Sequence, residues 1–318
     1  MTRRAVDPAA LFEAARQGDR SALARSLSLI ERGGEPARVI GRLAYPLGGQ
    51  AYTVGITGAP GAGKSTLTSI LIGYLRARDE EVAVLAVDPT SPFSGGAILG
   101  DRVRMQDHAT DPGVFIRSMA TRGHLGGLAL AAPQAIRLLD AVGRALVLVE
   151  TVGVGQVEVE IAGKADTTVV VVNPGWGDSV QANKAGLMEI ADVFVINKAD
   201  RKGVDETRRD IEVMLDLSDL GDWRPPIIPT VAHQNEGAEA LWAAVTDHRA
   251  YAEESGLLKR RREARLRQEL VEIVGARLDV RARELCQGDT YERLEADVLA
   301  RRIDPWAAAD EMLGGLGA

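Results

Sequence analysis

Apolar residues in the first 43 positions recur at intervals of three or four, which is the spacing of an amphipathic helix. Polar turn signals at residues 19–21 and 32–35 divide this stretch into short helices. Residues 46–50 then lead into a short, continuous apolar run without helical spacing. The pattern predicts an N-terminal helical extension over residues 1–48, with helix-spaced apolar positions at Leu11, Phe12, Ala15, Leu23, Leu27, Ile30, Val39, Ile40 and Leu43.

From residue 52 onward, short and almost wholly apolar runs alternate with helix-length segments. Runs of this kind are typical of parallel strands that are covered on both faces. The candidate strands are residues 52–57, 82–87, 114–116, 145–150, 167–173, 193–197 and 227–230. The alternation predicts an α/β fold with a doubly wound, mainly parallel sheet, in a domain that covers residues 49–250.

After Tyr251 the strand signal ends, and residues 257–313 are rich in Arg, Glu, Leu and Ala with helical spacing. Asp304 before Pro305 is typical of a helix N-cap followed by proline at the first helical position, and Gly314 suits a stop. We therefore predict a helical C-terminal arm over residues 251–318. Its apolar stripe either folds back over the sheet or pairs with a second copy, and the stripe alone does not decide between them.

Composition narrows the classes of partner. The formal net charge of -7 disfavours nucleic acid, because duplex binding depends on basic patches that neutralise phosphates. The basic run at residues 259–262 is followed by Glu263 and is expected to be a solvated helix face. Cys286 is the one cysteine, which excludes an intrachain disulfide and fits a reducing cytosol. We expect a cytoplasmic protein with no export signal and no membrane span.

The segment after the first predicted strand reads GAPGAGKS and leads into a helical pattern over residues 66–76. Its glycines let successive backbone N–H groups face inward, and the helix adds the positive end of its dipole to that anion nest. Lys64 is expected to reach the β- and γ-phosphates of a nucleoside triphosphate, and Ser65 to bind Mg²⁺. The predicted nucleotide-binding residues here are Gly58, Ala59, Pro60, Gly61, Ala62, Gly63, Lys64, Ser65 and Thr66.

The sequence NKAD at residues 197–200 ends another predicted strand, at the edge where open α/β sheets bind ligands. A carboxylate there accepts hydrogen bonds from the ring N–H and the exocyclic amine of guanine, whereas adenine would leave it unpaired. The motif therefore predicts GTP and GDP rather than adenine nucleotides. The predicted base-side residues are Asn197, Lys198 and Asp200, with Val231 and Ala232 after the last strand.

Acidic residues mark the Mg²⁺ side of this expected site. Glu150 follows five apolar residues at the end of a predicted strand, where P-loop proteins place an acidic residue, and Gly153 is the expected γ-phosphate sensor. Asp88 and Asp101 are further carboxylates able to approach the metal through water. Asp88 precedes a proline and is equally typical of a turn start. Val154 stands where Ras-type GTPases have a water-orienting glutamine, so the chain either orients water with a different residue or hydrolyses GTP slowly until a partner acts, and we favour the second reading.

Six segments in order carry a family resemblance: residues 58–65 (GAPGAGKS), 88–92 (DPTSP), 95–101 (GGAILGD), 125–127 (LGG), 150–156 (ETVGVGQ) and 197–200 (NKAD). The chain resembles the MeaB/ArgK-like GTPases, also called MMAA-type, which are chaperones of adenosylcobalamin-dependent methylmalonyl-CoA mutase. The likeness covers most of residues 40–256.

The resemblance implies a GTPase that assists an acyl-CoA mutase, gates its cofactor loading and protects or reactivates it. It also implies a homodimer formed through the C-terminal arm. By the same resemblance, Lys64 and Glu150 join Gln181 and Lys184 as catalytic residues, the last two on a switch loop that moves when the mutase docks. The metal-side residues are Ser65, Asp88, Asp101 and Glu150. Residues 173–178 (NPGWGD) depart from the best-known members, which leaves the identity of the mutase open.

Two other classes of function compete. Nickel-insertion GTPases share a related sheet, but the four histidines and the single cysteine here are scattered without ligand spacing. A regulatory GTP switch with another protein client needs only nucleotide binding. Stimulation of hydrolysis by an added acyl-CoA mutase would separate the chaperone from both alternatives.

Overall fold

The computed structural model describes residues 7–88, 106–120, 127–151, 163–175, 189–218 and 221–314. The chain forms two compact units, one from Met1 to Arg265 and the other from Leu266 to Ala318. The predicted divisions at residues 48 and 250 stay proposed domain boundaries. They would divide the first unit, and the proposed C-terminal arm would begin inside it.

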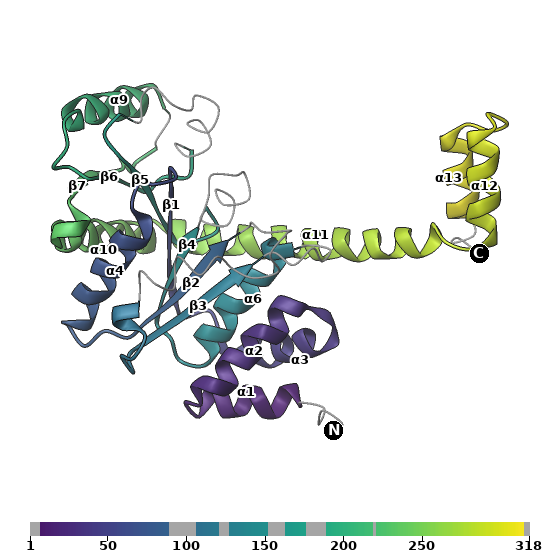
Figure 1. The fold of residues 1–318 in the computed structure, drawn as a ribbon, viewed down its shortest axis with the longest axis horizontal. Coiled ribbons are helices and arrows are strands. Elements are labelled where there is room, and N and C mark those ends of the chain that lie inside the picture. Colours follow the sequence, from purple (N-terminus) through teal and green to yellow (C-terminus); the bar gives the residue numbers. More distant parts are fainter. Residues whose placement is uncertain are drawn as a thin grey trace. The chain divides into compact units, whose positions relative to one another are not determined.

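A seven-stranded parallel sheet forms the centre of the first unit (Figure 1). Its order is β3-β2-β4-β1-β5-β6-β7, so the chain leaves β1 toward one edge and later returns to build the other. Such a reversal next to β1 is where doubly wound sheets bind ligands. The strands are β1 Tyr52–Gly58, β2 Val82–Asp88, β3 Val114–Ala120, β4 Leu146–Thr151, β5 Thr167–Val172, β6 Val193–Asn197 and β7 Ile227–Thr230.

The seven predicted strands are confirmed, with one clear difference in length. β3 extends to Ala120 instead of ending at residue 116. The sequence pattern fails there because Arg117 interrupts the apolar run. In the structure one nitrogen of its guanidinium donates to Ser28 and pairs at 2.5 Å with Glu31, so its charge is paired between the strand and the helix over residues 20–32.

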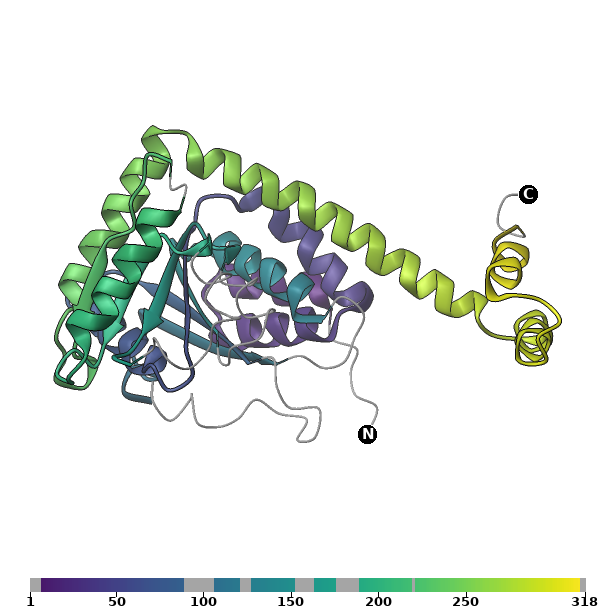
Figure 2. The ribbon, with the colours of Figure 1, turned by 90° about the horizontal axis from the view of Figure 1, so that it is seen from above.

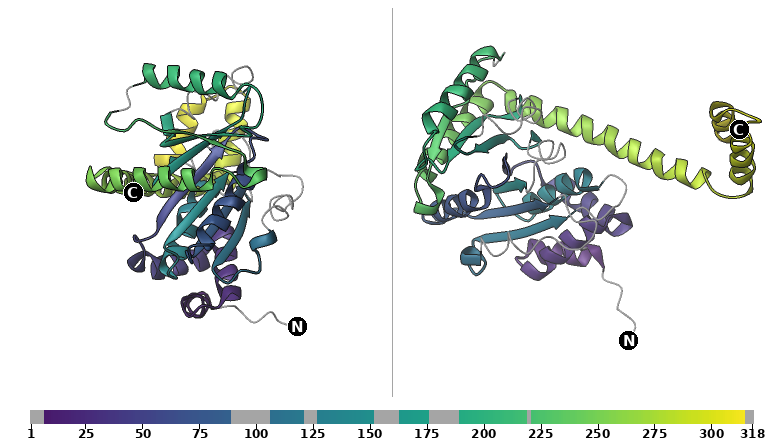
Figure 3. Two further views of the ribbon diagram at one scale, coloured as in Figure 1. Left: turned by 90° about the vertical axis from the view of Figure 1, so that its left-hand side faces the viewer. Right: turned by 45° about the horizontal axis from the view of Figure 1, so that its top comes forward.

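Helices cover both faces of the sheet. One face packs against α1–α3 and α6, with Leu27 and Ile40 fully buried, and α9 covers the same face beside β5 and β6. The opposite face packs against α4 and α10. Figure 1 separates α4 and α10 from α6, and Figure 3 shows the three N-terminal helices in purple grouped together. These helices are α1 Pro8–Arg16, α2 Arg20–Arg32, α3 Gly34–Ala44, α4 Lys64–Arg76, α6 Gly127–Ala141, α9 Val204–Leu217 and α10 Ala238–Glu254.

The predicted N-terminal and C-terminal helices are confirmed. Asp19 caps α2 by accepting hydrogen bonds from the Ser21 and Ala22 N–H groups. Near the C-terminus, Asp304 accepts from the Trp306 N–H at 2.9 Å, which confirms the predicted cap. The C-terminal helices are α11 Leu257–Leu285, α12 Asp289–Leu299 and α13 Pro305–Gly314. Among the described residues, no helix has both the length and the apolar character that crossing a membrane requires.

The start of α11 corrects the prediction for the basic run. Figure 2 shows the chain passing from α10 into the first turns of α11, which carry Arg261 and Arg262. These side chains do not form a solvated face, because they pair with Asp192 and Asp166, whose buried carboxylates belong to the residues just before β6 and β5. The sequence could not show this, since the partners lie about 70 and 96 residues away.

The two buried carboxylates are held ionised. Burial alone would raise the pKa of Asp166, but hydrogen bonds from Arg262 and the charge of Arg265 outweigh it and lower the pKa below the ordinary value. Burial likewise opposes ionisation of Asp192, and its contacts with His248 and Arg261 lower its pKa. Both groups therefore stabilise the fold while they are ionised.

Acid should weaken this arrangement. A carboxylate whose pKa is lower in the folded state adds stability above its unfolded pKa of about 3.9 and loses it as pH falls through the folded value. We expect the free energy of unfolding to drop steeply below about pH 4. Asp166→Asn should be less stable at pH 7 and should show a shallower acid dependence in urea unfolding at several pH values.

Asp216→Asn is the matched control, because its pairing with Arg224 is exposed and contributes little. Identical acid profiles for Asp166→Asn and the wild type would contradict the assignment.

Candidate functional site

The loop between β1 and α4 has the backbone geometry of a phosphate cradle. Gly58, Gly61 and Gly63 have φ angles of 136°, 69° and 93°, which side-chain-bearing residues rarely adopt. A Cβ at Gly58 would lie 1.9 Å from the Val171 carbonyl oxygen, and one at Gly63 would lie 2.4 Å from Asn197 Nδ2. The glycines therefore serve both the turn and the close approach of neighbouring strands. α4 begins at Lys64, two residues earlier than predicted.

Lys64 stands at the first position of α4 and is mostly buried. Its ammonium donates to the Gly58 and Ala59 carbonyl oxygens at 2.8 and 3.1 Å, so the charge lies against the loop. The N–H groups of the first helical turn and this ammonium supply positive potential at one place. That combination suits a polyphosphate.

Ser65 and Glu150 meet at the same place. The Ser65 hydroxyl donates to Glu150 Oε1 at 2.5 Å, and the Glu150 side chain is fully buried. They meet because β4 lies beside β1, with Ile56 opposite Glu150 in the register. A hydroxyl and a carboxylate are hard oxygen donors of the kind that Mg²⁺ prefers. These two residues fit a magnesium ion by their chemistry.

Asn197 joins the base-side loop to the phosphate loop. Its amide Nδ2 donates to the Ala62 carbonyl oxygen at 2.7 Å, and its Oδ1 accepts from the Thr230 hydroxyl and the Ala232 N–H. The side chain is 2% exposed. One buried amide therefore ties together the chain segments that follow β1, β6 and β7. Sequence reasoning missed Thr230, although a hydroxyl residue at the end of a strand at this edge was a usable signal.

Lys198 and Asp200 lie on the loop after β6. Lys198 has a φ of 60°, and its ammonium donates to the Gly61 carbonyl oxygen at 2.6 Å. The Ala199 N–H donates to the Thr230 carbonyl oxygen, which holds the loop against β7. Asp200 is exposed. The lysine stem thus crosses from the base-side loop to the phosphate loop, and Asp200 stays accessible to a ligand.

Asp88 is the last residue of β2, at the same sheet edge, and its side chain lies outside the described part of the chain. Asp101, Gly153, Gln181 and Lys184 fall outside the described residues altogether. Val231 and Ala232 follow β7 and are both buried. The described residues contain no group of three or more His, Cys, Asp or Glu side chains arranged to hold a metal ion.

Two threonines join the strands just behind the phosphate loop, and the sequence analysis did not identify them. The Thr151 hydroxyl donates to the Thr57 hydroxyl at 2.9 Å, and both side chains are buried. Thr57 precedes the loop, and Thr151 follows Glu150. This bond keeps the ends of β1 and β4 together, where Ser65 and Glu150 meet.

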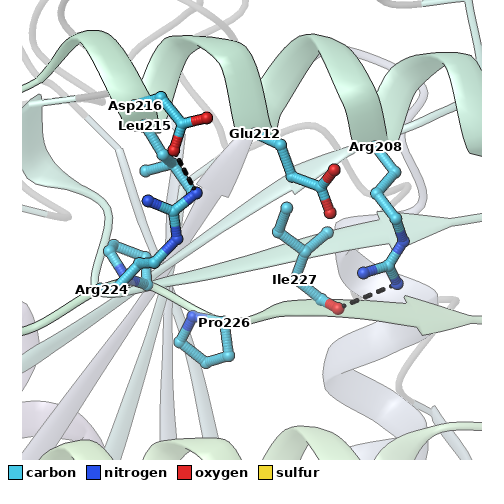
Figure 4. A pocket seen from close by; sticks show the side chains of 8 residues that line it. Arg208, Glu212, Leu215, Asp216, Arg224, Pro226 and Ile227 are labelled. Carbon is cyan, nitrogen blue, oxygen red and sulfur yellow. Dashed lines mark hydrogen bonds and ion pairs between the residues drawn. The ribbon is translucent and has the colours of Figure 1, made fainter.

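A separate hollow of about 320 Å³ lies between α9 and the start of β7 (Figure 4). Arg224 pairs with Asp216 at 2.7 Å, and Arg208 donates to the Ile227 carbonyl oxygen at 3.2 Å. Ile227 is the first residue of β7, so the hollow lies at the amino edge of the sheet, opposite the nucleotide motifs. It does not belong to the site described above.

Gly58→Ala should destabilise the fold strongly. Its Cβ would meet backbone atoms of Val171 and its φ would be strained, which together cost about 3 kcal/mol. Gly61→Ala is the control, because nothing lies within 4 Å of its Cβ and only the left-handed φ opposes it, at about 1 kcal/mol. Urea unfolding without nucleotide measures both changes. Equal losses in the two variants would show that packing at Gly58 does not matter.

Comparison with known proteins gives a consistent result. The family described as "Methylmalonyl Co-A mutase-associated GTPase MeaB" matches residues 23–286. A protein of Pyrococcus abyssi that is named as a GTPase is 52% identical over 96% of this chain and 97% of its own length. GTPase ArgK of Escherichia coli is 37% identical over 78% of this chain and 78% of its own.

Among solved structures, one titled as a LAO/AO transport system kinase has a TM-score of 0.67 and 24% identity, with both chains covered in full. This likeness supports the fold. The family match, the relatives and the geometry of the P-loop agree: the chain belongs to the MeaB family of GTPases.

Proposed function

We propose that this GTPase is a chaperone of an adenosylcobalamin-dependent acyl-CoA mutase, with methylmalonyl-CoA mutase as the first candidate client. It would use GTP hydrolysis to gate cofactor loading and to protect or reactivate the mutase. The family description, which names that mutase, supports the client. The observation that carries the nucleotide chemistry is the junction at Asn197, which binds the phosphate loop to the base-side loop through the Ala62 carbonyl.

Phosphoryl transfer to water needs positioned charge more than covalent chemistry from the protein. In our proposal, the N–H groups of the phosphate loop and the Lys64 ammonium hold the β- and γ-phosphates and neutralise the charge that develops on them. Lys64 must exchange its bonds to the Gly58 and Ala59 carbonyls for the phosphates. This exchange needs little movement, because the ammonium already lies against the phosphate loop.

Mg²⁺ would be held by Ser65 and Glu150, with Asp88 and Asp101 acting directly or through water. The ion, when bound, supplies Lewis-acid stabilisation of the phosphate oxygens. The hydroxyl that Ser65 now donates to Glu150 would turn its lone pairs to the metal. The burial of Glu150 favours this role, since a buried carboxylate gains most from a nearby cation.

Guanine selection is assigned to Asp200, with the Lys198 stem alongside the base. The exposed carboxylate would accept from the ring N–H and the exocyclic amine. Asn197 does not need to touch the base in this arrangement, because its hydrogen-bonding groups already hold Ala62, Thr230 and Ala232. Val231 and Ala232 would line the same end of the site.

We further propose that hydrolysis is slow without the client. Val154 occupies the place of the glutamine that orients water in Ras-type GTPases, and Gly153 would sense the γ-phosphate. Gln181 and Lys184 would complete the catalytic arrangement when the mutase docks. A partner that orders these residues would then raise the rate.

Self-association through the C-terminal unit is also proposed. After Arg265, α11 exposes Leu270, Val271 and Leu278, each more than 60% accessible, and Trp306 on α13 is 82% exposed. Exposed apolar side chains at this density are typical of an interaction surface. A second copy of the chain would cover them, in a homodimer that works in the cytosol.

Asp200→Asn should change base preference. An amide in place of the carboxylate loses the paired acceptance from guanine and fits xanthine instead, so GDP affinity should fall by about two orders of magnitude or more. Competition between GDP and XDP for the purified protein measures this change. An unaltered preference for GDP in the variant would remove the guanine assignment.

The client should accelerate hydrolysis. Purified protein is assayed for phosphate release from GTP with methylmalonyl-CoA mutase, with isobutyryl-CoA mutase and with neither. We expect one mutase to raise the rate about tenfold or more, on the scale that partner-supplied groups reach in GTPases. Lys64→Ala, which should not bind GTP, gives the background.

In the same assay, Gln181→Ala and Lys184→Ala should lower the stimulated rate more than the basal rate. An equal loss in both rates would contradict their role in the switch. No stimulation by either mutase, with GTP still bound, would contradict the chaperone proposal and favour a regulatory switch or a metal-delivery GTPase.

A further inference from the structure

The first turns of α11 make hydrogen bonds and ion pairs at the amino ends of the strands, whereas the nucleotide motifs follow the carboxyl ends. Arg261, Arg262 and Arg265 lie within about 100° of one another around the helix axis, because a helix turns 100° per residue. Arg262 donates to both carboxylate oxygens of Asp166, at 3.1 and 2.6 Å. It also donates to the Gly49 and Ala51 carbonyl oxygens, both at 2.8 Å. One guanidinium therefore holds the segments that lead into β5 and β1.

Asp166 itself joins these two strands. Its Oδ2 accepts from the Thr53 N–H at 3.0 Å, and its own N–H donates to Thr53 at the hydroxyl and the carbonyl oxygen. Arg265 makes a further ion pair with the same carboxylate. The Asp166 side chain is 2% exposed. A buried charge this well satisfied has one favourable position, so it defines how β1 and β5 align.

Arg261 ties together the next pair of strands, β5 and β6, in the same way. It binds Asp192 through both nitrogens of its fork, at 3.0 and 2.9 Å. Asp192 Oδ2 also accepts from the Thr168 N–H at 2.9 Å, which ties the start of β5 to the residue before β6. His248 of α10 approaches the same carboxylate at 3.2 Å. The amino ends of β1, β5 and β6 are thus held together through two carboxylates and the arginines of one helix.

These three strands end in the nucleotide motifs. β1 leads into the phosphate loop, and β6 leads into Asn197 and Lys198. The end of β5 lies between them, where the Val171 carbonyl accepts from the Ala59 N–H at 3.2 Å. Each strand has five to seven residues and is packed on both faces. Because short packed strands do not bend freely, alignment at one edge is carried to the other.

We propose that Arg261 and Arg262 are positioning residues for the nucleotide site, acting through β1, β5 and β6. Arg262 aligns the phosphate loop with β5, and Arg261 aligns the loop that selects the base. The second half of this statement rests on the proposed guanine selection by Asp200. A planar fork with several fixed donors is required, so lysine cannot replace either arginine without loss.

The test uses charge-conserving variants of the full chain. Arg261→Lys and Arg262→Lys keep the charge and lose the fork, and Arg260→Lys is the matched control. Arg260 is the neighbouring exposed residue, and its guanidinium donates to the Ser255 carbonyl oxygen. Affinities for GDP and IDP are measured by displacement of a fluorescent GDP analogue, well below each variant's melting temperature. IDP lacks the exocyclic amine that Asp200 would bind.

The two arginines should give different results. Arg261→Lys should lower the ratio of GDP affinity to IDP affinity about fivefold, because it loosens the base-side loop. Arg262→Lys should weaken both nucleotides about fivefold and leave their ratio nearly unchanged, because it loosens the phosphate loop. Arg260→Lys should match the wild type in both measurements. A general loss of stability would not separate the ratio from the affinity in this way.

Wild-type affinities and ratio in folded Arg261→Lys and Arg262→Lys would overturn the proposal and leave the arginines a purely structural role. Should Arg261→Lys fail to fold, Asp192→Asn takes its place, because it keeps the shape and weakens the same ion pair, and its ratio should fall likewise. If the wild type itself does not prefer GDP to IDP, guanine selection by Asp200 fails. The affinity of Arg262→Lys for the two nucleotides then still tests whether contacts at the amino ends of the strands position the phosphate loop.

Discussion

The close approach of backbone segments at the carboxyl edge of the sheet is the constraint on which the rest of the site depends. Gly58 lies against the Val171 carbonyl, and Gly63 lies against the Asn197 amide, at distances that exclude a Cβ. This contact lets Asn197 reach Ala62 and lets Lys64 fold over the loop. On the other side of β1, the pairing with β4 brings Glu150 to Ser65. A wider spacing would separate the phosphate side from the base side.

At the amino ends of the strands, buried charge pairs rather than close backbone packing hold the structure. The carboxylates of Asp166 and Asp192 are buried, and a buried charge is costly unless its partners and hydrogen bonds are complete. Arginines of α11 complete them, and main-chain N–H groups of β1 and β5 add further bonds. Such pairs contribute modestly to net stability but tolerate few alternative arrangements. They are thus better suited to setting strand alignment than to strengthening the core, which is supplied by apolar side chains on both faces.

The chaperone role proposed above would give these two ends of the strands a common purpose. A GTPase that serves another protein must hold nucleotide firmly and yet respond to its client. The phosphate loop, the Ser65–Glu150 pair and the Asn197 junction provide the firm part. The aligned strands provide a route by which a change at α11 would alter nucleotide affinity. In this proposal, contacts made by α11 would influence ligand binding through strands that are packed on both faces.

The sequence by itself determined the order of elements, the parallel sheet and the nucleotide motifs, because these depend on local periodicity and on glycine, lysine and asparagine at set spacings. Cap residues such as Asp304 were likewise predictable, since a cap acts within three residues. Only the tertiary structure decided the roles of Arg117, Thr230, Arg261 and Arg262. Their partners lie 33 to 213 residues away, and a charge or hydroxyl in a sequence does not show which distant group will bury beside it. Pairing of this kind is set by strand order and register, which emerge only when the whole sheet packs.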